Sequence, residues 1–223
     1  MTKTHTVQTR KPSARLRRRA SQIANRLADA FPQPTTELHH QNTFELLVAT
    51  ILSAQCTDER VNMVTPELFR AYPDAHAMAR SNPKQVETHI NSLGLFRNKA
   101  KNLVAMAGDL VDQHDGVVPA RRESLEALPG VGRKTASVVL SSGFGQPALA
   151  VDTHVQRVSQ RLGLSDGGGP LRVEGDLTTL FPPEQWHDVH HGLILHGRRT
   201  CKARRPLCES CILSDLCPSQ HKE

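Results

Sequence analysis

The sequence predicts an all-α protein. Apolar residues recur at steps of three and four along several segments, and helix-capping residues stand in front of some of these segments. No alternation of apolar and polar residues is long enough for a sheet. We therefore expect many short helices with short connections in a chain of 223 residues, a length that suits one large domain or two small ones.

The first helices are expected at 13–30, 44–56 and 58–71. Asn42 and Glu45 have the spacing of an N-cap with its capping-box partner, and they open the apolar run Phe44–Leu52. The longest apolar run of the chain, Leu46–Leu52, is interrupted by Thr50 and is far shorter than the roughly 18 residues of a membrane span.

The next helix begins at Asn82-Pro83, where a proline occupies the first helical position, and we expect it to stop at Gly94. The segment Phe96–His114 has the pattern of an amphipathic helix. Its apolar residues at helical spacing are Ala100, Leu103, Val104, Ala107, Leu110 and Val111. Further helices are expected at 121–128, 133–142, 153–162 and 171–180.

The net charge of +6 belongs to the N-terminal tail. Residues 1–20 hold seven basic residues and no acid, so the rest of the chain nets −1. Residues 1–12 are expected to be a disordered tail that adds only non-specific, salt-sensitive affinity for nucleic acid. An aromatic content of 4% argues against single-strand binders that stack bases on aromatic platforms.

No apolar segment follows the basic N-terminus, so we expect no secretory signal. The bacterial cytoplasm or nucleoid is the expected location, without membrane association. An organelle transit segment is the alternative, because the N-terminus is rich in Arg and free of acids.

Four of the five cysteines, Cys201, Cys208, Cys211 and Cys217, are spaced C-x6-C-x2-C-x5-C. Two disulfides or four unrelated buried thiols fit less well than a metal, because nothing marks the chain as secreted. Four thiolates suit Zn²⁺ or an iron–sulfur cluster, and the wide spacings favour the larger [4Fe–4S] cluster. Cys56 is remote in sequence and is interpreted as a small buried residue.

Basic residues cluster between the first two of these cysteines. A metal would stiffen this loop and present Lys202, Arg204 and Arg205 at fixed positions, where they would lose little entropy on meeting phosphates. The alternative is a solvated charged loop.

A glycine-rich turn joins two expected helices at 128–136. Gly130 and Gly132 permit positive φ and leave backbone N–H groups uncovered, which at a helix N-terminus can hold a phosphate. The GxxxxGK spacing of a Walker A loop is missing. Taken alone, the segment is an ordinary helix–helix turn.

Lys134 and Asp152 stand at two expected helix starts. Asp152 can cap the helix at 153–162, and a helix N-terminus also keeps a carboxylate ionised. The same dipole disfavours the charge of Lys134, and a lysine attacks carbon only as the neutral amine. The two residues would form a nucleophile and its partner.

These segments together resemble the endonuclease III family of helix-hairpin-helix DNA glycosylases. The resemblance covers about residues 20–218. It rests on LPGVGRKTA, VDTHVQRV, LLVATILSAQCTD, GLFRNKA, HHGLILHGRRTC and the cysteine spacing.

The resemblance implies a two-domain all-α fold with DNA in the cleft between the domains. One domain would be a helical barrel at 36–146, and the other would combine 13–35 with 147–223 and bind [4Fe–4S]. The protein would act as a monomer on duplex DNA that holds a damaged pyrimidine or an abasic site.

By the same resemblance, Lys134 attacks C1′ of the damaged nucleotide and Asp152 assists it. The base leaves, a Schiff base forms, and β-elimination cuts the strand 3′ to the lesion. Gln55 and Leu95 would fill the space of the extruded base and wedge the duplex. The resemblance also implies two residue sets. DNA contacts would come from Gly130, Val131, Gly132, Arg133, Thr135, Lys202, Arg204 and Arg205, and the lesion pocket from Ser53, Asp58 and His154.

Three alternatives compete with this interpretation. An adenine glycosylase would need a Glu where Thr50 stands and would lack the Schiff-base lysine. A glycosylase for mismatched thymine shares the scaffold and is harder to separate. A non-catalytic helix-hairpin-helix module would need the glycines but not Lys134 and Asp152.

Overall fold

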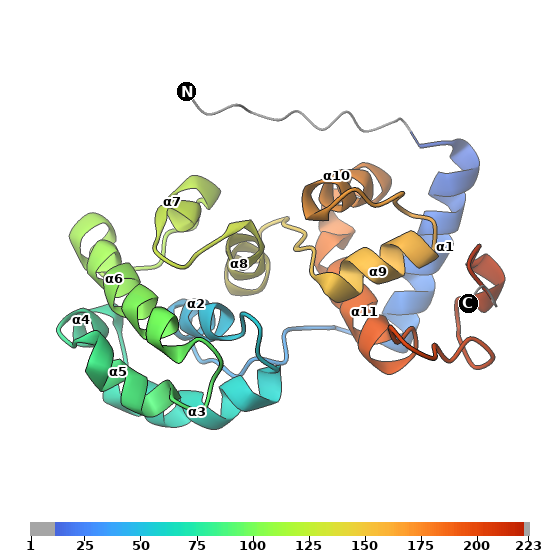
Figure 1. Cartoon of the computed structure of the whole chain (residues 1–223). Helices are drawn as coiled ribbons and strands as arrows, with labels where there is room; N and C mark the ends of the chain where they lie inside the picture. The colour runs from blue at the N-terminus through green and yellow to red at the C-terminus, as the bar shows by residue number, and fades with distance from the viewer. Residues whose placement is uncertain (1–11, 221–223) are drawn as a thin grey trace. The chain divides into compact units, whose positions relative to one another are not determined.

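The computed structural model describes residues 12–220, and every regular element in that range is helical (Figure 1). The all-α prediction is therefore confirmed. The predicted basic tail at 1–12 lies outside the described residues, apart from Pro12. Within the described range, no helix is both long and apolar enough to cross a membrane.

The chain divides into two compact units. The unit Thr36–Gln146 is one continuous segment. Its helices are α2 Thr43–Leu52, α3 Asp58–Ala71, α4 Ala75–Ala79, α5 Pro83–Ile90, α6 Phe96–His114, α7 Arg122–Ala127 and α8 Arg133–Val138, followed by a π-helical turn at Val139–Gly143.

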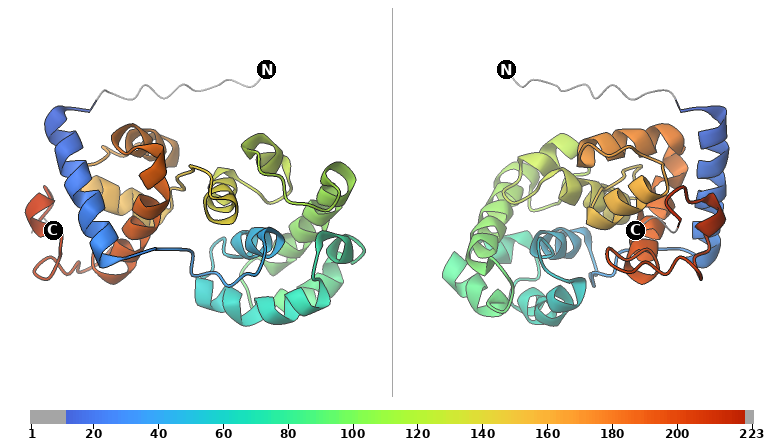
Figure 2. Two further views of the ribbon diagram at one scale, coloured as in Figure 1. Left: turned by 180° about the vertical axis from the view of Figure 1, so that it is seen from behind. Right: turned by 45° about the vertical axis from the view of Figure 1, so that its right-hand side comes forward.

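The other unit, described over 12–35 and 147–220, combines the two ends of the chain (Figure 2). Its helices are α1 Ala14–Ala30, α9 Thr153–Arg161, α10 Pro170–Leu180 and α11 Trp186–Arg199, with short 3-10 turns at Pro183–Gln185 and Ser214–Leu216. The part of the chain that carries the four clustered cysteines has only the second of these turns as regular structure.

Helix α2 is the centre of the unit Thr36–Gln146. Nine of its ten residues are buried, and it packs against α3, α6, α8 and the π-helical turn. Asn42 caps it by accepting a hydrogen bond from the Glu45 N–H at 2.9 Å. Glu45 does not complete the predicted capping box, because its carboxylate accepts the N–H of Gln41 instead, at 2.7 Å.

Two further helix predictions need correction. The helix expected at 44–56 spans Thr43–Leu52, so Cys56 lies beyond it and is half-buried instead of buried. The helix that starts at Asn82-Pro83 makes the full capping box with Gln85 but ends at Ile90, four residues before Gly94. The chain then turns through 91–95, and the next helix begins at Phe96. Helices α4, of five residues, and α11, of which more than half is buried, were not expected.

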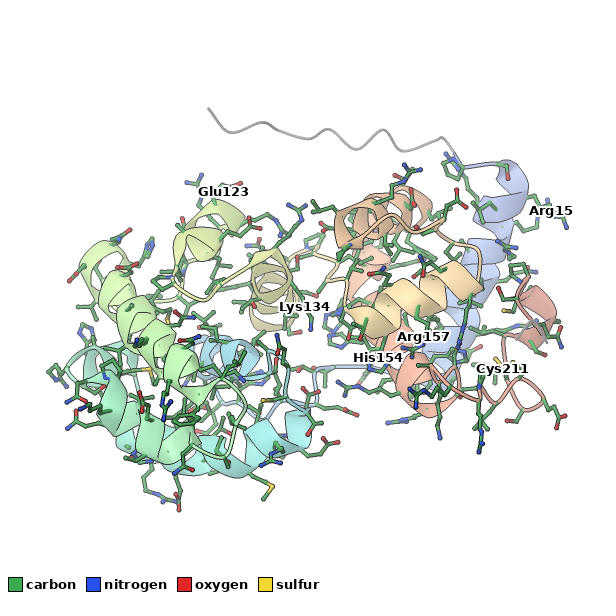
Figure 3. All side chains as sticks on the ribbon, viewed as in Figure 1. Arg15, Glu123, Lys134, His154, Arg157 and Cys211 are labelled. Carbon is green, nitrogen blue, oxygen red and sulfur yellow. The ribbon has the colours of Figure 1, made fainter. Side chains whose placement is uncertain are left out.

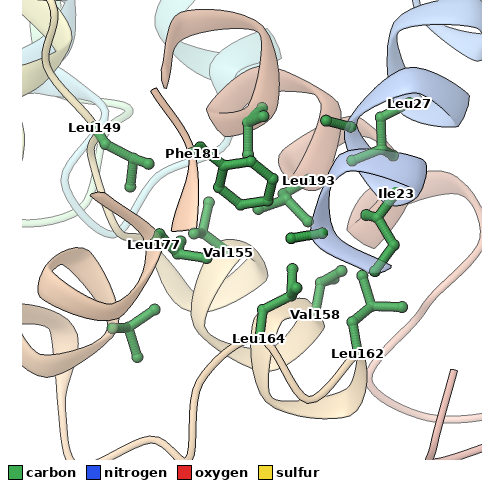
Figure 4. Packing of buried hydrophobic residues seen from close by; sticks show 14 of the residues in the cluster. Ile23, Leu27, Leu149, Val155, Val158, Leu162, Leu164, Leu177, Phe181 and Leu193 are labelled. Atoms are coloured by element: carbon green, nitrogen blue, oxygen red, sulfur yellow. The ribbon is translucent and has the colours of Figure 1, made fainter. Parts of the chain in front are cut away.

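The second unit packs around an apolar cluster supplied by all four of its α-helices (Figure 4). Helix α11 packs between α1 and α9, and α10 contacts α9. The largest contributors include Ile23 and Leu27 from α1, Val155 and Val158 from α9, Leu177 from α10 and Leu193 from α11. This cluster fixes α9, the helix that begins directly after Asp152.

Candidate functional site

The glycine-rich turn joins α7 to α8, and these two helices pack on each other. Gly130 has φ +80°, and a Cβ added there would meet the Asn102 Cβ at 2.9 Å, so both backbone and space require glycine. Gly132 has φ −95°, which corrects the prediction that it uses positive φ. It is the exposed N-cap of α8, and a Cβ added there would meet no atom within 4 Å.

Below the turn, Val131 is buried and its N–H donates to the Leu128 carbonyl at 3.1 Å. The first amide of α8 that bonds back into the helix belongs to Ala136, which donates to the Gly132 carbonyl at 3.0 Å. The three preceding residues, Arg133, Lys134 and Thr135, form the first turn, where amides lack intrahelical partners. Arg133 and Lys134 have exposed side chains, and Thr135 is half-buried.

Lys134 therefore lies in the first turn of a helix with its side chain open to solvent (Figure 3). Exposure leaves the amine accessible to a large substrate, without the burial that often accompanies a lysine nucleophile. The role of Lys134 as the nucleophile stays a prediction.

Asp152 is half-buried at the N-cap of α9, where its carboxylate accepts the Val155 N–H at 2.8 Å. This bond fixes the orientation of the carboxylate at the start of the helix. Asp152 belongs to the second unit and Lys134 to the unit Thr36–Gln146, so each is placed here within its own unit. Their pairing stays a prediction.

The three residues expected in a lesion pocket are also divided between the units. Ser53 and Asp58 flank the turn between α2 and α3; both are half-buried, and the Ser53 hydroxyl donates to the Thr50 carbonyl at 2.9 Å. His154 lies on α9 beside Asp152. Burial lowers the pKa of His154, and its Nδ1 is 3.1 Å from the Arg157 guanidinium.

Gln55 and Leu95, the expected wedge residues, are exposed on two separate turns of the unit Thr36–Gln146. Leu95 leaves 56% of its surface exposed, which is high for a leucine. Its place between Ile90 and Phe96 outside any helix confirms that it lies on a turn.

The four clustered cysteines line one pocket in the second unit. Among residues 12–220, no three His, Cys, Asp or Glu side chains are close enough to hold a single metal ion. A zinc site would need thiolates near 2.3 Å from the metal and so near one another. Four sulfurs that line one pocket without forming a single-ion site fit a multi-iron cluster better.

The surroundings of the pocket also suit an iron–sulfur cluster. The Leu213 N–H lies 3.4 Å from Cys211 Sγ, and Arg161 donates to Cys201 Sγ at 3.5 Å. Such donors stabilise thiolates and tune a cluster. Burial raises the pKa of the Cys211 and Cys217 thiols, so proton loss there requires the positive charge of a metal.

Two arginines of α9, one helical turn apart, hold the start of the cysteine loop. Arg157 donates to the Gly197 carbonyl at 2.9 Å and to the Cys201 carbonyl at 3.1 Å. Arg161 donates to the Lys202 carbonyl at 2.6 Å and to the Ala203 carbonyl at 3.0 Å. Neither was expected from the sequence, where their four-residue spacing was the only available signal.

These bonds leave the cationic side chains of the loop free to point outward. Lys202, Arg204 and Arg205 are all exposed, and the backbone of Arg205 is left-handed at φ +53°. A loop clamped through its backbone while its cations face solvent is suited to contact phosphates.

Comparison with known proteins gives consistent matches over almost the whole chain. Residues 48–183 match the HhH-GPD superfamily of base excision DNA repair proteins, and 201–217 match the iron–sulfur binding domain of endonuclease III. Endonuclease III of Synechocystis is 52% identical over 204 residues, covering 91% of this chain and 93% of that protein. Endonuclease III of Escherichia coli is 47% identical over 201 residues, covering 90% and 95%.

Among solved structures, a trapped covalent intermediate of endonuclease III with DNA matches with a TM-score of 0.87. It is 46% identical, and the match covers 92% of this chain and 96% of that one.

Proposed function

Because the chain belongs to the endonuclease III family, we propose that it is a bifunctional DNA glycosylase and abasic-site lyase that removes oxidised pyrimidines from duplex DNA. The observation that carries the proposal is the position of Lys134, exposed in the first turn of α8 directly after the glycine-rich turn. A turn that binds phosphate would bring the DNA backbone to this amine.

In the proposed reaction the neutral amine of Lys134 attacks C1′ of the damaged nucleotide, and the bond from C1′ to the base breaks. The Asp152 carboxylate stabilises positive charge that develops on the sugar and accepts a proton from the attacking nitrogen. The Lys134–C1′ adduct opens to a Schiff base, loss of a C2′ proton follows, and β-elimination expels the 3′ phosphate. This sequence removes the base and cuts the strand in one active site.

We propose that DNA is held at two places. The amides of Gly130, Gly132 and the first turn of α8 would bind phosphate beside Lys134, whereas the Val131 N–H donates to the Leu128 carbonyl. The loop cations Lys202, Arg204 and Arg205 would bind it in the other unit. The cofactor is a [4Fe–4S] cluster, which we propose is held by Cys201, Cys208, Cys211 and Cys217. When bound, its iron–thiolate bonds would fix the loop.

We propose a monomer in the cytoplasm or nucleoid of a bacterium, since the relatives named above are bacterial.

One observation argues against adenine glycosylase activity. Thr50 is buried, and its hydroxyl donates to the Leu46 carbonyl at 2.7 Å. A buried hydroxyl committed to the backbone cannot take the role of the acid that such an enzyme needs at this position.

Borohydride trapping on duplex DNA with thymine glycol tests the proposal. The wild-type protein should give a covalent adduct, which Lys134→Ala should lose and the exposed control Lys84→Ala should keep. Folded, iron-loaded wild-type protein that excises nothing and forms no adduct would refute the function. Iron analysis tests the cofactor, with about four irons per chain expected; one equivalent of zinc in colourless protein would contradict it.

A further inference from the structure

Two turns of the unit Thr36–Gln146 share an unusual backbone. Gln55, in the turn that follows α2, has φ +56°, and Leu95, in the turn that precedes α6, has φ +59°. Both side chains are exposed, and neither residue is a glycine, which normally occupies such positions. Left-handed residues of this kind persist only where the surrounding structure holds them, and they gather at functional sites.

A buried lysine connects the two turns. Lys99 of α6 leaves only 5% of its surface exposed. Its ammonium donates to the carbonyl of Leu52, the last residue of α2, at 2.8 Å, and to Cys56 Sγ at 3.1 Å. Its backbone N–H donates to the Leu95 carbonyl at 3.1 Å. One residue thus bonds to both ends of the Gln55 turn and to Leu95 itself.

Two other contacts reinforce this connection. The Cβ position of Gly94 is 4.0 Å from Cys56 Sγ, so the two turns touch beside the two wedge residues. Arg60, in the first turns of α3, donates to the Ser92 carbonyl at 2.8 Å.

Packing alone does not account for a lysine at position 99. Its ammonium donates to the Leu52 carbonyl and to the sulfur of Cys56. A carbonyl and a thiol bear no formal charge. Burying a charge costs free energy that such acceptors only partly recover, and an unbranched apolar side chain would fill the same space without that cost. The lysine adds hydrogen bonds that connect the two turns, and an apolar side chain cannot make such bonds.

We propose that Lys99 is a positioning residue that locks the Gln55 and Leu95 turns into one rigid wedge. This inference rests on the proposed function, in which these two side chains enter the duplex when the damaged base leaves the stack. Without Lys99 the two turns would lose their shared anchor, and the strained backbones of Gln55 and Leu95 would relax. Base extrusion would then slow, whereas chemistry on a base that is already unstacked would not.

The test compares Lys99→Met with Lys101→Met, an exposed lysine on the same helix. Single-turnover excision is measured for thymine glycol paired with adenine and for the same lesion in an unpaired three-nucleotide bubble. Lys99→Met should slow excision from the paired duplex about 10- to 100-fold and from the bubble less than about twofold, because misplaced groups cost rate only where they are used. Lys101→Met should change neither rate.

Combining Lys99→Met with Leu95→Ala tests whether the lysine acts through the wedge. The two effects on the paired substrate should be strongly less than additive. Equal slowing of paired and bubble substrates, or full additivity, would overturn the inference. Inactivity of the wild-type protein on both substrates would instead refute the proposed function. Should Lys99→Met fail to fold, Cys56→Ala removes one acceptor alone; a duplex-specific slowing of about threefold supports the proposal, and no change contradicts it.

Discussion

Two regions that present residues toward the proposed substrate are built in opposite ways. The wedge turns around Gln55 and Leu95 rest on α2 and α6, whose buried faces are apolar, and a buried lysine joins them. The loop 201–217 has one short 3-10 turn as its only regular element, and arginines hold it by its carbonyls.

The difference shows what each region needs in order to keep its shape. The wedge turns are fixed by the same core that folds their unit, so they should be ordered whenever that unit is folded. The cysteine loop buries few apolar side chains of its own, so its order depends on α9 and on the cofactor. Substitutions that affect only one region should show that the wedge turns depend on the core of their unit and that the cysteine loop depends on α9 and the cofactor.

Damage to the apolar core should have the largest effect. Leu47 is fully buried in the middle of α2, and Leu47→Ala should lower the free energy of unfolding by about 2–5 kcal/mol through lost burial and a cavity. Hydrogen exchange should accelerate in α2 and α6, and iron content should stay at the wild-type level. Loss of iron from this variant under native conditions would show that the regions are not separable in this way.

Loss of a cluster ligand should produce the converse pattern. Cys208→Ser should release iron and disorder the loop, weakening DNA binding by about 100-fold, or 2.7 kcal/mol, as three placed cations become mobile. Protection of α2 against exchange should not change. Binding titrations and iron analysis measure this, with Ser210→Ala, at an exposed position of the same loop, as the control that keeps both the iron and the affinity.

Acid should weaken the second unit next. Burial, chiefly, lowers the pKa of His191 from 6.5 to about 2; His190, His187 and Arg198 lower it further and Asp152 opposes them. The folded state therefore binds fewer protons than the unfolded state between these values. Neutral His191 therefore costs no stability above pH 6.5. As the pH falls below 6.5, the free energy of unfolding decreases, by about 2 kcal/mol at pH 5.

Denaturant unfolding at pH 7.5 and pH 5 checks the effect. His191→Gln should remove the share of this loss that belongs to His191 and leave the share of His196, whose pKa burial lowers to about 4. His39→Gln, at an exposed position, should leave the pH dependence as in the wild type. An unchanged slope in His191→Gln would contradict the assignment.

The smallest effect should come from the arginine clamp. Arg157→Met removes charge-assisted bonds to two carbonyls while keeping an unbranched side chain, and should cost about 1.5 kcal/mol. Because the clamp holds Cys201, a chelator should extract iron faster from this variant. Arg15→Met, on the exposed side of α1, is the matched control. If the chelator extracted iron from Arg157→Met and from the wild type at the same rate, the cluster alone would keep the loop ordered.

Local features of the fold were predictable from the sequence because they depend on neighbouring residues. The capping residues Asn42 and Asn82 and the amphipathic pattern of 96–114 each describe one helix. The end of α5 at Ile90 was not predictable from Gly94, because the turn that follows is held by Arg60 from another helix.

The candidate site residues were likewise predictable only where they depend on their neighbours in the sequence. The glycine turn, Lys134 and the cysteine spacing are contiguous in sequence and could be found there. Lys99 and Arg157 could not, because their partners lie 47 and 44 residues away, at Leu52 and Cys201. A lysine or an arginine with a backbone partner on a distant segment looks, in the sequence, like any other surface cation.

The left-handed backbones of Gln55 and Leu95 place stability and activity in conflict. Glycine at either position would relieve the strain, so selection for heat resistance alone would favour it. The same change would delete the side chain proposed to enter the duplex. Engineering of a more robust enzyme should therefore hold positions 55 and 95 fixed and look for its gains elsewhere.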